Sequence, residues 1–293
     1  VARLDSDDVT FKIVPRINAA GRIAHARICV SHLLDPDPSA AGQTAAQLNQ
    51  LNTRRQQIEH EIVARIRARI QREPALLEPR ILILWDAGWE PSVLGIAASR
   101  LCREHHIPVI LLSLKDGRAQ GSGRSIGRIN IHQALEGQSD LLERFGGHAM
   151  AAGLTVPEQN LDRLSRRLKV YVAEQFNPED FQKTQIIDAR LDLKDINHDL
   201  ASQLDRMRPF GVANPEPVFS SENVQVISSF IMGTCHRKMM VKNASDPDSL
   251  PVEALQFNVP DPDNLPDYFP KLIYRIKINR FKQESAQIII ESP

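Results

Sequence analysis

The pattern of apolar residues changes once along the chain, at a proline-rich segment, and this change constrains the fold more than any other feature. The segment runs from Pro209 to Pro217 and reads PFGVANPEP. Before it, short apolar runs alternate with longer amphipathic stretches, as they do where strands alternate with helices. After it, only short strand-like runs occur, separated by Pro, Asp and Asn. The chain is therefore predicted to fold as an α/β part followed by an all-β part.

A long stretch without proline precedes the α/β part. Between about Ser39 and Arg72, apolar residues recur mostly at three- and four-residue spacing, which predicts one long amphipathic helix. Its length suits a connector between domains. The turn signals of residues 35–39 predict its start. Residues 11–29, which carry Pro15 and Gly21, are predicted as a loop followed by a helix start.

The α/β part is predicted to hold a mixed sheet with flanking helices, because its short apolar runs are separated by amphipathic segments. Strands are predicted at 80–85, 108–112, 118–125 and 154–156, and helices at 92–103, 131–136 and 157–176. A further strand at 184–192 and a helix at 195–207 lead into the proline-rich segment.

The all-β part contains five strand-like runs, which predict a small barrel with the OB-fold as the leading candidate. The runs are 218–232, 237–243, 252–259, 271–279 and 285–291.

Composition excludes several classes of protein and leaves others open. The formal net charge is +0, so any nucleic-acid site must come from local clustering of cations. The three cysteines lie far apart and outside any CxxC pair, which argues against a zinc site or disulfides and fits a reducing cytoplasm. No apolar run approaches the roughly 18–20 residues that span a bilayer.

The segment Gly121 to Ser125 (GSGRS) is the first candidate site. Small residues let a phosphate approach the backbone. Ser122 and Arg124 are two residues apart on a predicted strand, so they face the same side and together suit a phosphate. Ser125 adds a second hydroxyl. A Gly-rich edge strand with a solvated arginine accounts for the same letters.

Two further segments combine glycine with polar groups. Gly146 and Gly147 precede His148, which predicts a tight backbone site whose imidazole donates to a phosphate or stacks on a base. The small residues 151–153 predict a helix N-terminus or a strand held close to another element. The alternative is a satisfied histidine in a glycine turn. In the segment 15–22, Arg16 and Arg22 flank Asn18, a pattern that suits a phosphate clamp, a domain contact or a helix start with exposed arginines.

The fourth candidate is a basic run near the C-terminus that no Asp or Glu interrupts. Cations interleaved with Tyr274 and Phe281 suit single-strand binding, in which phosphates meet cations and bases stack on rings. Arg237 and Lys238 extend the set, and a solvated strand face is the alternative. The run consists of Lys271, Arg275, Lys277, Arg280 and Lys282.

No segment carries the motifs of a catalytic centre. A two-metal nuclease needs several Asp and His residues that converge on its ions, and here the histidines are scattered. Triad spacing, a P-loop and a zinc signature are also absent from the sequence. We therefore predict no catalytic and no metal-binding residue, and no cofactor bound by this chain.

Taken together, these segments resemble the RecJ family of single-strand-specific DNA exonucleases, within the DHH phosphoesterase superfamily. The resemblance covers almost the whole chain, in order. It rests on PRINAAGR (15–22), LNQLNTRRQQIE (48–59), GWEPSVLGIAASRL (88–101), GSGRS (121–125), FGGHAMAAGL (145–154), RPFGVANPEPVF (208–219) and the closing barrel. The chain departs from the family at Glu90, where a histidine is often expected.

The resemblance implies a domain plan. Residues 1–34 would be the tail of an N-terminal DHH catalytic domain, which holds manganese or magnesium in the family. Residues 35–74 would be the connector helix, 75–180 the DHH-associated α/β domain, 181–217 a strand-helix linker, and 218–293 an OB-fold that binds single strands. The chain would thus be the C-terminal portion of the enzyme.

The resemblance also implies a function. The full-length protein would degrade single-stranded DNA from the 5′ end in repair and recombination, and this portion would bind DNA without cutting it. Ser122 and Arg124 would grip phosphate, helped by Arg16 and Arg22. Single-strand-binding protein and a helicase are candidate partners, and no membrane is expected. The alternatives are a non-catalytic nucleic-acid-binding module, or a DHH-family phosphoesterase that acts on short oligonucleotides.

Overall fold

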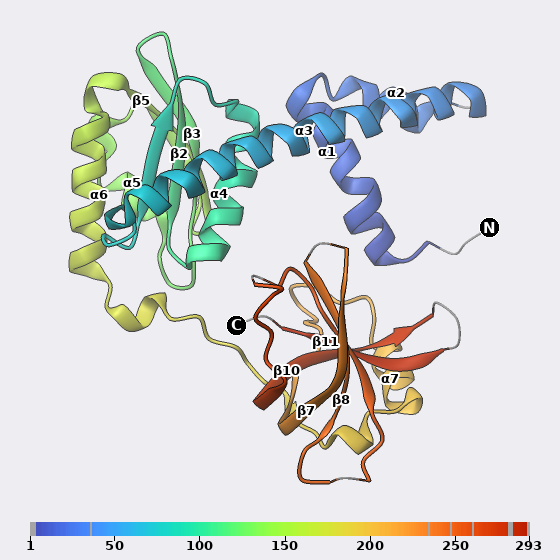
Figure 1. Ribbon diagram of the computed structural model, residues 1–293. Helices are drawn as coiled ribbons and strands as arrows, with labels where there is room; N and C mark the ends of the chain where they lie inside the picture. Colours follow the sequence, from blue (N-terminus) through green and yellow to red (C-terminus); the bar gives the residue numbers. More distant parts are fainter. Residues whose placement is uncertain are drawn as a thin grey trace. The chain divides into compact units, whose positions relative to one another are not determined.

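The computed structural model describes residues 4–35, 37–233, 235–246, 248–259, 261–280 and 284–291. The chain divides into two compact units, Val1–Lys183 and Thr184–Pro293. Figure 1 shows the first unit as a sheet with helices and the second as a barrel. The predicted fold class, an α/β part with a long helix followed by an OB-like barrel, is confirmed.

The sheet of the first unit has five strands in the order β1-β2-β3-β5-β4. β1 and β2 are parallel, and the other neighbours are antiparallel. The strands are β1 (Leu82–Asp86), β2 (Val109–Lys115), β3 (Arg118–Arg124), β4 (Arg144–His148) and β5 (Ala151–Pro157). A parallel pair needs a crossover, and the helix that follows β1 supplies it.

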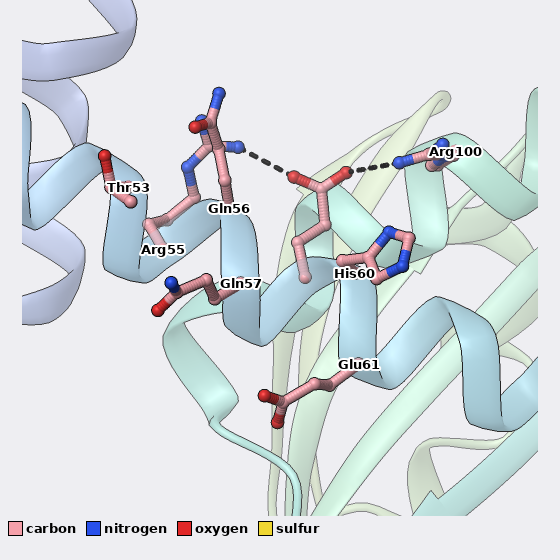
Figure 2. A pocket seen from close by; sticks show the side chains of 8 residues that line it. Thr53, Arg55, Gln56, Gln57, His60, Glu61 and Arg100 are labelled. Carbon is pink, nitrogen blue, oxygen red and sulfur yellow. Dashed lines mark hydrogen bonds and ion pairs between the residues drawn. The ribbon is translucent and has the colours of Figure 1, made fainter. Parts of the chain in front are cut away.

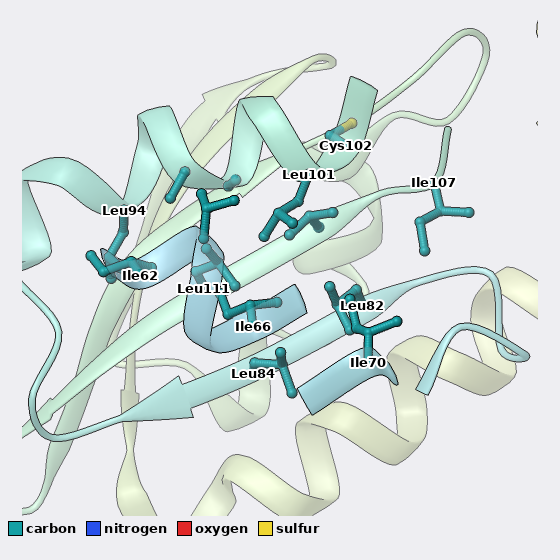
Figure 3. Close-up of a cluster of buried hydrophobic side chains, with 14 of the residues drawn as sticks. Ile62, Ile66, Ile70, Leu82, Leu84, Leu94, Leu101, Cys102, Ile107 and Leu111 are labelled. Atoms are coloured by element: carbon teal, nitrogen blue, oxygen red, sulfur yellow. The ribbon is translucent and has the colours of Figure 1, made fainter. Parts of the chain in front are cut away.

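Helices cover both faces of this sheet (Figure 1). One face packs against α3 and α4 through residues such as Ile66, Leu94 and Leu111, which Figure 3 shows together. The other face packs against α5 and α6 through residues such as Leu164 and Leu168. Each fully buried aliphatic side chain of this kind stabilises the fold by about 1.5–3 kcal/mol. The helices are α3 (Pro38–Arg72), α4 (Pro91–His105), α5 (Ile131–Glu136) and α6 (Leu161–Gln175).

The long helix α3 begins at a well-formed cap. The Asp37 carboxylate accepts from the backbone N–H groups of Ser39 and Ala40, at 2.9 and 3.4 Å, and Pro38 occupies the first turn. The C-terminal half of α3 packs on the sheet. Its N-terminal half packs through Leu48 on a small core that belongs to α1 (Val14–Ile23) and α2 (Arg27–Leu34).

Residues 11–29 do not begin with the predicted loop, which is a correction. They continue a π-helical turn, Asp8–Ile13, into α1 and α2. Pro15 favours a loop by pattern alone, but it lies in the first turn of α1, where its missing N–H has no partner to lose. The buried Ala19 and Ala20 then anchor α1.

Gly146, Gly147 and His148 form part of strand β4 and not a glycine turn, and residues 151–153 lie in a strand, which was one of the two alternatives. The three β4 residues pair with Gly153, Ala152 and Ala151 of β5, and the turn falls on Ala149 and Met150. Gly147 has φ +144°, and a Cβ there would lie 2.3 Å from the carbonyl oxygen of Ala151. The glycine is needed because β5 passes so close to the backbone.

The second unit is a barrel closed by five strands, in the order β7-β8-β9-β11-β10 with β10 also pairing β7. All neighbours are antiparallel except β9 and β11. This is the five-stranded Greek-key arrangement of an OB-fold. The strands are β7 (Phe219–Met232), β8 (His236–Asn243), β9 (Val252–Gln256), β10 (Tyr268–Asn279) and β11 (Ser285–Ile290).

The segment that leads into the barrel is less regular than predicted. The strand expected at 184–192 is reduced to β6 (Ala189–Arg190), which pairs with the start of β7. The helix expected at 195–207 is α7 (His198–Asp205). Both pack on the barrel core, where the hydroxyl groups of Tyr274 and Ser221 lie 2.7 Å apart.

Candidate functional site

The site predicted around GSGRS lies on one face of the sheet, on the side that carries α4. Strand residues that pair across a sheet share a face. Ser122 therefore shares its face with Gly153 and Gly146, and Arg124 shares it with Ala151 and His148. The row that begins at Ser122 thus continues in two glycines. In the row that begins at Arg124, an alanine separates the arginine from the histidine. The structure thus brings two predicted segments, GSGRS and the one that contains Gly146 and His148, to one surface with a low floor.

Arg124 is held in place by its own strand. Its Nη1 donates to the Ser122 hydroxyl and to the Gly123 carbonyl oxygen, both at 2.8 Å. The Ser122 hydroxyl in turn lies 3.5 Å from the carbonyl oxygen of Ala152. The guanidinium is half-buried. Its orientation is therefore fixed before any ligand arrives, which lowers the entropic cost of binding.

Gly95 of α4 makes room for this pair of side chains. A Cβ at position 95 would lie 2.7 Å from Nη2 of Arg124 and 3.2 Å from Oγ of Ser122. The glycine was not predicted as part of the site. Its signal is a glycine inside a helix, where it is unfavourable by about 1 kcal/mol relative to alanine and so often has a packing reason.

Arg22 brings a second cation to Arg124. Its Nη1 donates to the Ser92 carbonyl oxygen at the start of α4, at 2.8 Å. Burial lowers the pKa of the Arg124 guanidinium, and the nearby charge of Arg22 lowers that pKa further. No Asp or Glu of the described ranges forms an ion pair with either arginine. Two close cations without a carboxylate make an electrostatic site for an anion.

The nearby thiol of Cys102 does not supply a nucleophile. The side chain is buried, and this burial raises the pKa of Cys102 to about 11. The thiol therefore stays protonated near neutral pH.

Of the other residues predicted for this site, Ser125 and Gly147 have structural roles, whereas Gly146 and His148 are accessible to a ligand. Ser125 is buried, and its hydroxyl donates to the Ile129 carbonyl oxygen at 2.6 Å, so it braces the turn after β3. Gly147 is needed for the approach of β5. Gly146 has open space where its side chain would be, and His148 is exposed at the edge of the sheet.

The predicted arginines of α1 have different surroundings. Arg16 donates to the Asn49 side chain and to the Lys12 carbonyl oxygen, so it fastens α1 to α3. Asn18 is exposed and lies one helical turn before Arg22, on the same side of α1. Only Arg22 reaches the electrostatic surroundings of Arg124.

Glu90, at the position where the resemblance implies a histidine, has a structural role. It is the N-cap of α4, and its carboxylate accepts from the Ser92 hydroxyl at 3.0 Å and from the Ser92 N–H at 3.3 Å. An acidic group suits a helix N-terminus, which carries a partial positive charge.

The polar side of α3 is also fixed to α4. The Glu59 carboxylate forms ion pairs with Arg55 of α3 at 2.7 Å and with Arg100 of α4 at 3.5 Å. Figure 2 shows these contacts beside an open hollow of about 530 Å³ that also touches Gln56 and His60. The pair between Glu59 and Arg100 holds α3 against the helix that carries Gly95, whereas the pair with Arg55 lies within α3.

The predicted basic run on β10 is largely neutralised. Arg275 pairs with Glu216 at 3.3 Å and with Glu291 at 2.8 Å, and Lys277 pairs with Glu216 at 3.3 Å. Glu216 belongs to the proline-rich segment, so its proximity does not appear in the local sequence. This surface therefore offers less free positive charge than the run of letters indicates.

The remaining basic residues of the barrel differ from one another. Arg280 pairs with Asp205 of α7 at 2.7 Å, and Lys238 pairs with Glu253 at 2.6 Å. Arg237 points into the barrel and is only 1% exposed. Lys271 is exposed and has no ion pair within the part of the chain that the structure covers. Phe281 and Lys282 lie outside the described residues.

Exposed rings lie on another part of the barrel that the sequence reasoning missed. Phe230 of β7 is 59% exposed, and Phe257 after β9 is 43% exposed. Phe257 contacts the His236 ring edge-on, with centroids 5.3 Å apart. The sequence feature that could have identified them is an aromatic residue on the outward side of a predicted strand-like run. The β8–β9 face is where OB-folds usually bind single strands.

No group of three or more His, Cys, Asp or Glu residues is placed to hold a metal ion within the ranges that the structure describes. The described side chains therefore do not fit a two-metal centre. None of the described helices is both long and apolar enough to cross a membrane.

Comparison with known proteins follows this geometry. The DHHA1 domain model matches residues 78–174, and the RecJ OB domain model matches residues 187–292. The chain is 33% identical over 99% of its length to the single-stranded-DNA-specific exonuclease RecJ of Salmonella typhimurium, of which it covers 51%. It is 31% identical over 84% of its length to the RecJ protein of Bacillus subtilis, of which it covers 31%.

A solved structure agrees with these relatives. The crystal structure of RecJ in complex with Mn²⁺ from Thermus thermophilus superposes with a TM-score of 0.77 at 26% identity, and covers 98% of this chain and 41% of that one. The chain thus spans about half the length of its Salmonella relative, and less of the others. Over its DHHA1 domain and its RecJ OB domain, the chain belongs to the RecJ family.

Proposed function

We propose that this chain holds the 5′-terminal phosphate of single-stranded DNA on the open sheet face. Arg124 and Arg22 attract the phosphate, and the Ser122 hydroxyl orients the Arg124 guanidinium. The observation that carries the proposal is the half-buried Arg124 beside the exposed Arg22, neither of which has a carboxylate partner among the described residues. A phosphate dianion is the ligand that such a pair suits best.

The floor of the site suits a strand end. Gly146, Gly153 and Ala151 leave the surface low between Arg124 and His148, so a sugar-phosphate backbone has room to lie there. A hollow of about 440 Å³ extends the floor beside Gly146 and Gly153 toward Thr155 and Arg144. Contacts of this kind read the backbone, so little sequence preference is expected.

We propose that the full-length protein is a metal-dependent exonuclease that degrades single-stranded DNA from the 5′ end. The relatives carry that substrate in their names, and one was crystallised with Mn²⁺. Manganese or magnesium would be held by a DHH domain that precedes these residues. The exposed apolar side chains of Phe11, Leu33 and Leu34 suit a contact with that domain.

The domain plan follows from this proposal. Residues 1–34 belong with the catalytic domain, 35–74 connect, 75–180 hold the strand end, 181–217 link, and 218–293 hold the strand further from the cut. Phe230 and Phe257 offer rings for bases in that last domain. Lys271 is the one cation of the predicted run that has no ion pair in the described part of the chain.

Single-strand-binding protein and a helicase are proposed partners, and the cytoplasm is the proposed location. A nuclease that needs a single strand depends on an enzyme that separates the duplex and on the protein that covers the product. No residue of this chain is assigned to either partner.

The phosphate site is tested by binding of 5′-phosphorylated and 5′-hydroxyl oligonucleotides. We expect the phosphate to raise affinity about tenfold, and Arg124→Ala to abolish that difference. Arg118→Ala is the matched control, because Arg118 lies on the same strand and is already paired with Glu143 at 2.9 Å. Equal affinity for both oligonucleotides, or equal loss in both variants, would remove the assigned role.

The absence of cutting is tested separately. The purified chain is incubated with Mn²⁺ and a 5′-labelled single strand, and we expect binding without release of nucleotides. Robust manganese-dependent digestion would contradict the assignment of catalysis to another domain.

A further inference from the structure

The outer edge of β1 carries backbone groups that have no partner in the sheet. β1 is the last strand in the order, and its Leu82 N–H donates to the Pro108 carbonyl oxygen of the β2 side at 2.9 Å. In a parallel pair, alternate residues direct both of their groups to the neighbour. Ile83 and Trp85 therefore direct theirs outward, and no hydrogen bond to these groups occurs within the described ranges.

This edge lacks the features that usually protect an edge strand. The strand reads LILWD, without proline, lysine or a bulge. Natural edges of this kind are covered or pair with another chain. The edge borders a hollow of about 480 Å³ between α3 and α6, which Ile83, Leu84 and Trp85 line on the strand side.

The walls of the hollow are basic. Arg69 of α3 faces it from one side, and Arg166 and Lys169 of α6 face it from the other. Arg69 has one weak ion pair, with Glu73 at 3.5 Å, and Arg166 donates to the Asp162 carbonyl oxygen. Asp162 is the only acidic residue that lines this hollow among the residues described.

We propose that the β1 edge binds an acidic, extended peptide of a partner protein, which adds to the sheet as a sixth strand. Its backbone would pair with Ile83 and Trp85. Its alternate acidic side chains would meet Arg166 and Lys169 on the α6 side, and the side chains between them would face Arg69 on the α3 side. Main-chain pairing gives such a site affinity, and the flanking side chains select the sequence. The cations favour acidic segments over neutral ones.

The edge favours a peptide over a nucleic acid. Ile83 and Trp85 each offer a donor and an acceptor at strand spacing, so the complementary ligand needs alternating donors and acceptors. A peptide backbone has both, whereas a phosphate backbone offers acceptors alone.

The first experiment uses the whole chain and a short fluorescent peptide of alternating Glu and Val, measured by fluorescence anisotropy. Two N-methylated versions block the N–H groups of the Glu set or of the Val set, and a third peptide has Lys in place of Glu. We expect one methylated peptide to lose at least tenfold in affinity while the other binds normally. We also expect the Lys peptide not to bind. Equal binding by both methylated peptides would overturn the strand-addition proposal.

The second experiment changes the protein. Arg166→Glu combined with Lys169→Glu is expected to weaken the acidic peptide at least tenfold. Arg163→Glu, on the same helix but outside the hollow, is the charge control and should change affinity less than twofold. Comparable loss in the control would mean that general charge attraction explains binding, and the site would be withdrawn.

A matched pair tests the edge itself. Trp85→Val and Trp85→Pro both remove the indole, but only proline removes the outward N–H, and proline is tolerated at a strand edge. We expect Trp85→Pro to bind at least fivefold more weakly than Trp85→Val. Equal affinity of the two variants would overturn the proposal, and the methylated peptides decide independently if the proline variant does not fold. If oligo-dT displaces the peptide, and the Arg166→Glu and Lys169→Glu changes abolish that displacement, the hollow would instead be assigned to DNA.

Discussion

Gly95 lies directly against Arg124, because a Cβ on Gly95 would be only 2.7 Å from Nη2 of the Arg124 guanidinium. The atom that it would strike is the far end of a flexible side chain, so Gly95→Ala should fold. The arginine would have to leave its hydrogen bond to Ser122. We expect this variant to lose most of the preference for 5′-phosphorylated single strands, measured as the affinity ratio to the 5′-hydroxyl strand.

A second helical glycine provides the control for this prediction. Gly42 of α3 has open space where its Cβ would be. Gly42→Ala should raise the free energy of unfolding by up to about 1 kcal/mol, since alanine is the better helix former, and leave binding unchanged. If Gly95→Ala binds the phosphorylated strand as tightly as Gly42→Ala does, Arg124 is not positioned by Gly95.

The pairing of Arg275 and Lys277 with Glu216 predicts a gain of function. Glu216→Gln removes the negative charge that both cations share, so more positive charge faces a bound strand. We expect tighter binding of single-stranded DNA at low salt, and a slope of log affinity against log salt that is steeper by about 1. Fluorescence titrations at several salt concentrations measure both quantities.

Glu222→Gln is the matched control in the same unit. Glu222 forms its ion pair with Arg190 at 2.8 Å, and among the described residues it has no ion pair with Lys271, which lies across from it on β10. The Glu222→Gln substitution removes the same charge as Glu216→Gln, so it should reproduce only the general effect of net charge on DNA binding. Identical salt slopes for the two variants would show that Arg275 and Lys277 do not meet the strand.

Much of the fold was predictable because its signals are local. The continuous apolar runs of β1 and β2 and the three- and four-residue spacing of α3 each reflect the burial of one element. The change of pattern at Pro209–Pro217 predicted the all-β part, although the second compact unit begins earlier, at Thr184. The loop predicted at the start of residues 11–29 was wrong, because proline is also favoured in the first turn of a helix and the sequence alone does not show where that turn begins.

The candidate site was predictable where neighbours on one strand form it, as with Ser122 and Arg124. It was not predictable where distant segments meet. Gly95 clears space for a side chain of another element, and Glu216 neutralises cations that lie about 60 residues further on, at Arg275 and Lys277. Ser125 looks like its neighbour Ser122 in sequence, and only the contact with Ile129 distinguishes the two. Such differences arise from tertiary packing and not from local spacing.

The two adjacent glycines of β4 are predicted to differ sharply on substitution. Gly147 has φ +144°, and a Cβ there would lie 2.3 Å from backbone of β5, so Gly147→Ala should lower the free energy of unfolding by roughly 2 kcal/mol or more. Gly146 has nothing within 4 Å of a built Cβ, so Gly146→Ala should leave stability nearly unchanged. Denaturant unfolding of both variants makes the comparison, and similar losses would contradict the close approach of β5.

The buried hydroxyl of Tyr274 predicts a stability that depends on alkaline pH. Burial raises the pKa of Tyr274 to about 12, from 10.0, and the opposing hydrogen bond to Ser221 is the smaller influence. Because the folded state binds the proton more tightly, this group contributes its full stabilisation below about pH 10 and loses it as pH rises toward 12. The loss amounts to roughly 2–3 kcal/mol. Denaturant unfolding of wild type and Tyr274→Phe between these pH values isolates the effect, since the phenylalanine variant lacks the titrating group. We expect the stability of wild type to fall more steeply than that of the variant, and parallel curves would show that the Tyr274 proton is held no more tightly in the folded protein than in the unfolded chain.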